Sequence, residues 1–128
     1  MKQKHMLFIA FSLLIIVLFL AGCRKAEPNL EIENFILDEY KQEIATFPPP
    51  KSYDSFNIST GEDALAAAET VVADVYDNVE EKEPYSVYYD ESTKAWMVKG
   101  SLPKVMNGGV PYVVFNQQGE VLAVWHTK

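Results

Sequence analysis

The sequence has few of the residues that most catalytic and metal sites require. Among its 128 residues there is one cysteine, Cys23, and only two histidines, His5 and His126. A lone cysteine cannot form an internal disulfide. His5 lies in the N-terminal segment that is interpreted below as a cleaved signal, so a Ser–His–acid triad would have to use His126, two residues from the C-terminus. No group of acids has the spacing of a calcium loop. We therefore expect no enzymatic activity, no catalytic residues, no metal site and no cofactor.

Basic side chains are also scarce. The chain has 11 Lys and Arg against 18 Asp and Glu, which gives a net charge of −7. Nucleic acids and anionic lipid surfaces require a basic face, so neither is an expected partner. The acidity favours a basic protein as the partner. The alternative explanation is that the negative charge only keeps the protein soluble.

The N-terminus has the three-part layout of an export signal. A basic head, residues 1–5, precedes an apolar run over 6–20 that is interrupted only by Ser12. The run is shorter than the ~20 apolar residues that span a bilayer comfortably. We predict that residues 1–22 are a cleaved signal peptide; the alternative is an uncleaved anchor helix.

Leu20-Ala21-Gly22-Cys23 resembles the bacterial lipobox. The resemblance implies cleavage before Cys23 and attachment of diacylglycerol to its thiol, and two or three acyl chains make a stable anchor. Removal of residues 1–22 would leave 106 residues with 9 basic and 18 acidic side chains, a net charge of −9. We expect a lipid-anchored protein on the cell membrane or outer membrane that faces the periplasm or the cell exterior.

Residues 23–57 are expected to link this anchor to the folded domain. Apolar residues recur at three- and four-residue spacing from Ile32 to Ile44, which predicts one amphipathic helix over 30–46. Pro48-Pro49-Pro50 must end that helix and begins a proline-rich connector. The sequence leaves open whether the segment 30–46 packs on the domain or lies partly detached.

Residues 58–128 have the pattern of one α+β domain. Thr60 is a good N-cap for an amphipathic helix over 61–78. Four strands are predicted after it, over 85–89, 94–102, 110–116 and 121–127, with turns at 90–93 and at Gly119. The expected fold is α+β, an amphipathic helix packed on a four-stranded antiparallel meander, with an extra N-terminal helix.

An ordered series of motifs spans this domain. It consists of an Ala-rich helix that opens with Glu62-Asp63-Ala64, then Lys82-Glu83-Pro84-Tyr85, Trp96-Met97-Val98-Lys99-Gly100-Ser101-Leu102-Pro103, Gly108-Gly109-Val110, Val113-Val114-Phe115-Asn116, Gly119 and His126-Thr127-Lys128. In these motifs the region from about residue 58 to 128 resembles a family of bacterial immunity proteins with a nuclear-transport-factor-2-like fold. The resemblance implies that the α+β domain is of nuclear-transport-factor-2-like or cystatin-like type. The resemblance implies a non-enzymatic protein that binds and neutralises a toxin delivered by a neighbouring cell.

The motif residues themselves are interpreted as determinants of the fold. Trp96 and Val98 are predicted to project to one face of their strand, Gly100 suits a bend, and Gly108-Gly109 suits a loop. The full set of family-motif residues is Pro84, Tyr85, Trp96, Val98, Gly100, Pro103, Gly108, Gly109 and His126. Two other hypotheses are an accessory envelope lipoprotein that binds a peptide or an envelope component, and a small isomerase or dehydratase.

Overall fold

A computed structural model describes residues 30–76, 83–101 and 109–127. The expected signal segment, Cys23, Pro103 and Gly108 lie outside these residues. No helix within the described ranges is long and apolar enough to cross a lipid bilayer.

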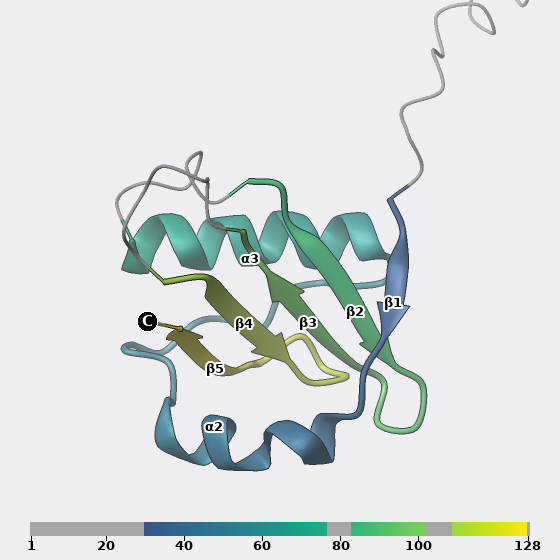
Figure 1. The fold of residues 1–128 in the computed structure, drawn as a ribbon, viewed down its shortest axis with the longest axis horizontal. Helices are drawn as coiled ribbons and strands as arrows, with labels where there is room; N and C mark the ends of the chain where they lie inside the picture. Colours follow the sequence, from purple (N-terminus) through teal and green to yellow (C-terminus); the bar gives the residue numbers. More distant parts are fainter. Residues whose placement is uncertain (1–29, 77–82, 102–108, 128) are drawn as a thin grey trace, which may run out of the picture.

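A five-stranded sheet forms the middle layer of the fold, with its strands in sequence order (Figure 1). Four strands make an antiparallel meander, and the first strand pairs in parallel with the second. The strands are β1 (Ile32–Asn34), β2 (Ser86–Asp90), β3 (Ala95–Lys99), β4 (Pro111–Phe115) and β5 (Val121–His126). The helical elements are the 3-10 helix η1 (Leu37–Tyr40) and the α-helices α2 (Lys41–Thr46) and α3 (Gly61–Val75). The predicted α+β class and the meander are confirmed, and the sheet has one strand more than expected.

Helix α3 begins where the sequence predicts, because Thr60 and Asp63 form a capping box. The Asp63 backbone N–H donates to the Thr60 hydroxyl, and the Thr60 N–H donates to the Asp63 carboxylate, both at 3.2 Å. The helix ends at Val75, since Tyr76 has extended backbone angles. The predicted end at residue 78 was therefore too late.

The prediction of a single helix over 30–46 is wrong. Its first part forms β1, and only η1 and the six-residue α2 are helical. The reason is a non-local alternative: β1 gains a neighbour at the sheet edge, and the Phe35 N–H donates to the Tyr89 carbonyl at 3.3 Å. The Leu37 N–H then donates to the Asp90 carboxylate at 2.8 Å. The segment thus packs on the domain, which answers the question that the sequence left open.

The proline-rich connector also contacts the sheet, at the turn between β4 and β5. Gly119 has a φ of +77°, as expected for a left-handed turn residue, and its carbonyl accepts a hydrogen bond from the Phe56 N–H at 2.9 Å. A Cβ added to Gly119 would lie 1.8 Å from the Phe56 carbonyl oxygen. This close approach requires glycine at the turn.

The two faces of the sheet carry separate hydrophobic clusters. In Figure 1, α3 lies on one side of the sheet and α2 on the other. Side chains alternate along β3, so that Trp96 and Val98 contact the α3 side while Met97 contacts the α2 side. The first cluster includes Ala64, Ala67, Ala68, Val71, Val72, Val87, Val113, Phe115 and Val124, and the second contains Val114, Ala123 and Trp125 beside Met97.

Candidate functional site

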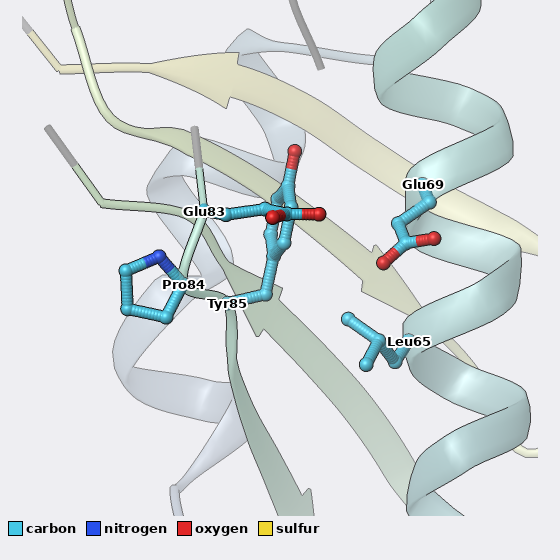
Figure 2. A pocket seen from close by; sticks show the side chains of 5 residues that line it. All are labelled: Leu65, Glu69, Glu83, Pro84 and Tyr85. Atoms are coloured by element: carbon cyan, nitrogen blue, oxygen red, sulfur yellow. The ribbon is translucent and has the colours of Figure 1, made fainter. Parts of the chain in front are cut away.

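An acidic depression lies between α3 and the segment that enters β2. Leu65 and Glu69 project from the helix toward Tyr85, and Glu83 and Pro84 complete the lining (Figure 2). Its volume is about 590 Å³, and it opens widely to solvent. Two of the motif residues, Pro84 and Tyr85, therefore lie at a concave surface.

Burial and mutual repulsion shape the electrostatics of this depression. Burial raises the pKa of Glu69, and the nearby Glu83 carboxylate raises it further. Burial also raises the pKa of Tyr85 to about 12, with contributions from Glu69 and Glu83. Negative charge is costly here, so a cation such as a lysine or arginine side chain would be favoured at this position.

A second concavity, the aromatic groove, lies along the β5 edge of the sheet and is lined by residues from the C-terminal ends of α2 and α3 and from β5. It has a volume of about 530 Å³ and is mainly apolar. Phe47, 43% exposed, stacks on Trp125 with their ring centroids 6.5 Å apart. The groove is lined by Thr46, Phe47, Pro48, Pro50, Val75, Tyr76, Val124, Trp125 and His126. Aromatic rings around a concave apolar surface are typical of sites that bind another protein.

His126 lies in the wall of this groove. Its Nδ1 is 3.0 Å from the Tyr76 hydroxyl, and the two rings meet edge to face with centroids 5.5 Å apart. Burial raises the pKa of Tyr76, so the phenol stays protonated at neutral pH and can donate to His126. The arrangement positions the imidazole on the surface of the groove.

The other described motif residues hold the sheet together. Trp96 and Val98 are buried against α3, and the Trp96 ring lies 4.5 Å from that of Tyr89. The Gly100 N–H donates to the Pro111 carbonyl at 2.9 Å. A Cβ on Gly109 would lie 1.6 Å from the Thr127 carbonyl oxygen, so this close contact requires glycine.

The structure does not bring the motif residues that it describes to one site. They divide between the interior, the acidic depression and the aromatic groove. Sequence reasoning missed Phe47, Glu69 and Tyr76, which line the concave surfaces. No local signal marked Glu69 or Tyr76, because each faces residues far away in the sequence.

The described surface is strongly acidic and offers no evident metal site. The described ranges contain 14 Asp and Glu residues and four lysines. Two of these lysines form ion pairs, Lys41 with Asp38 and Lys51 with Asp74. Within these ranges, no group of three or more His, Cys, Asp and Glu side chains could hold a metal ion.

These features define a small α+β protein with an acidic surface and an aromatic groove, a combination suited to binding another protein. Residues 63–128 match the model of the NTF2 fold immunity protein family. The match covers just over half of the chain, and the chain belongs to this family. Membership indicates that the protein acts in neutralising a toxin. No curated protein and no solved structure matches the chain.

Proposed function

We propose that this chain is a lipid-anchored immunity protein that neutralises a cognate toxin by covering the surface through which the toxin acts. The family match over residues 63–128 carries the proposal. Immunity by occlusion needs no chemistry from the inhibitor. It requires a stable interface, which buries roughly 1,200–2,000 Å² in ordinary protein complexes.

The charge of the chain supports a basic toxin as the partner. Acids outnumber lysines by 14 to four in the described ranges. Complementary charge accelerates encounter and disfavours acidic partners. The acidic depression offers one position for a basic side chain of the toxin, between Glu69 and Glu83.

The membrane anchor rests on the sequence Leu20-Ala21-Gly22-Cys23. Lipid on Cys23 would hold the domain outside the cytoplasm, where an incoming toxin first meets the cell. Such a position would allow the toxin to be bound before it reaches its target.

Co-expression tests this function. A candidate toxin, taken from a gene next to this one, is produced in cells with and without the chain, and survival is counted. We expect the chain to restore growth. Unchanged killing in the presence of the well-produced chain would contradict the proposal.

A Cys23→Ala variant tests the anchor separately. Cleavage at a lipobox depends on the modified cysteine, so the variant should keep residues 1–22 and carry no acyl chain, whereas mass spectrometry of the unmodified chain should show an acylated chain that begins at Cys23. An unmodified chain that keeps residues 1–22 and carries no acyl chain would contradict lipidation at Cys23 and favour an uncleaved helix.

The aromatic groove favours a second candidate, an accessory envelope lipoprotein that binds a peptide. Its apolar volume of about 530 Å³ could accept part of an extended chain. A gene without a toxin gene beside it, together with binding of an envelope peptide in the groove, would favour this function over immunity.

A further inference from the structure

β1 forms one edge of the sheet in the described part of the chain. β1 pairs with β2 on one side, and no strand of the described ranges lies on its other side. The Phe35 N–H points inward to Tyr89. Because backbone groups alternate in direction along a strand, the groups of Ile32 and Asn34 point outward. The outer side of β1 can therefore pair with another strand.

The opposite edge of the sheet is partly closed. β5 is its last strand, and the Val124 N–H donates to the Phe47 carbonyl at 3.1 Å. The segment that follows α2 therefore covers part of that edge. An incoming strand would find a less obstructed backbone at β1.

Exposed apolar side chains flank the free edge. All three residues of β1 are exposed. Ile32 is 47% exposed and Ile36 is 55% exposed. Among the described residues, Phe47 is the one other large hydrophobic residue that is exposed. The Ile32 side chain lies against Gly61 at the start of α3. The exposed parts of Ile32 and Ile36 would lose water contact if a partner covered them.

The charge at this edge selects the kind of partner. Glu31, directly before β1, and Glu33, within it, are exposed, and the Glu33 carboxylate also accepts a hydrogen bond from the Tyr88 hydroxyl. The exposed Asp38 and Glu39 follow β1. Lys41, the one basic residue between positions 30 and 46, forms an ion pair with Asp38 at 3.9 Å. A second copy of the chain paired here would face acids with acids, whereas a basic strand would be attracted.

We propose that the β1 edge binds an extended basic segment of the toxin as an additional strand, with Ile32 and Ile36 covered by its apolar side chains. This inference rests on the proposed immunity function and names the surface that performs it. The family match begins at residue 63, so β1 lies outside the part of the chain shared with the family model. Recognition through β1 would allow this chain to be specific for its cognate toxin while residues 63–128 keep the fold that the family shares.

Charge reversal tests the proposal. The full chain, solubilised in detergent, is titrated with the purified toxin against which it protects cells in the co-expression experiment. We expect Glu31→Lys/Glu33→Lys to weaken binding on the order of a hundredfold at low salt and less at high salt. The matched control is Asp54→Lys/Glu120→Lys, which makes the same charge change at two exposed acids away from β1 and should bind within about threefold of the unmodified chain.

Hydrogen exchange tests the backbone pairing directly. Toxin binding should slow exchange of the Ile32 and Asn34 amides at least tenfold, and Asn34→Pro, which removes an outward donor, should weaken binding while Tm is retained.

The outcomes separate this inference from the function on which it rests. If the toxin binds and cells are protected but both double variants bind equally, or if the β1 amides exchange as before, the edge proposal is overturned and the immunity function stands. The same holds if Glu31→Lys/Glu33→Lys changes only self-association of the chain. If the unmodified chain neither binds the toxin nor protects cells, the immunity function itself fails.

Discussion

The sheet is covered differently on its two faces. The 15-residue α3 covers one face with small side chains, which allow close contact with buried residues of β2, β3 and β4. The six-residue α2 and the short η1 cover the other face largely with partly buried rings and aliphatic side chains. The α3 face is built by a long capped helix, whereas the α2 layer depends on hydrogen bonds and ring contacts with the sheet.

The largest expected difference concerns packing. Phe115 is fully buried on the α3 face, so Phe115→Ala should reduce the free energy of unfolding by about 3–5 kcal/mol. Ile44 is only partly buried in the α2 layer, and Ile44→Ala should cost about 1–2 kcal/mol. Urea denaturation measures both values. Equal losses would show that the α2 layer is packed as firmly as the α3 face.

The Asp90 carboxylate joins the α2 layer to the end of β2 through hydrogen bonds. Asp90 is 5% exposed and accepts hydrogen bonds from the Leu37 N–H, the Ser92 N–H and the Ser92 hydroxyl. Asp90→Ala leaves these donors without their acceptor and should cost about 2–3 kcal/mol. Thermal unfolding compared with Asp90→Asn, which retains one acceptor oxygen, separates loss of charge from loss of hydrogen bonding. A cost below about 0.5 kcal/mol, which is typical of ordinary surface substitutions, would contradict this role.

The same carboxylate predicts a pH dependence. Hydrogen bonds from Leu37 and Ser92 hold the pKa of Asp90 well below its usual value of about 3.9. Its contribution to stability is therefore complete above pH 5 and declines as the pH falls through about 4 toward the folded-state pKa. Unfolding followed from pH 6 to pH 2 should show a smaller decline for Asp90→Asn than for the unmodified chain.

The cap of α3 tests the local side of the comparison. Thr60→Ala removes the acceptor for the Asp63 N–H and should lower stability by about 1 kcal/mol, while Thr60→Ser should lower it by less. Chemical denaturation of both variants gives the difference. If Thr60→Ser costs as much as Thr60→Ala, the hydroxyl is not the stabilising group.

The smallest expected effect lies at the aromatic groove. Tyr76→Phe removes the hydroxyl that lies 3.0 Å from His126 Nδ1, in an exposed position. Stability should change by less than about 0.5 kcal/mol. The His126 ring resonances should shift in NMR spectra, because its hydrogen bond is lost. Unchanged resonances would indicate that the contact is not maintained in solution.

Local patterns predicted the elements whose stabilising contacts are close in sequence. Thr60, predicted as the N-cap, marked the start of α3, and the turn at Gly119 separated β4 from β5. The same patterns failed at β1, where helical spacing competes with pairing to β2. The concave surfaces were equally inaccessible, since Tyr76 and His126 are 50 positions apart.

The sequence by itself determined the α+β class, the capped helix and the acidic character of the chain, because each depends on composition or on local patterns. It also indicated the family, through an ordered series of motifs along residues 62–128. Only the tertiary structure decided that residues 32–34 extend the sheet and that Asp90 holds Leu37, 53 positions away. It also decided which motif residues became core and which became surface. These outcomes depend on the free energy of contacts between distant segments, which exists only when the chain is folded.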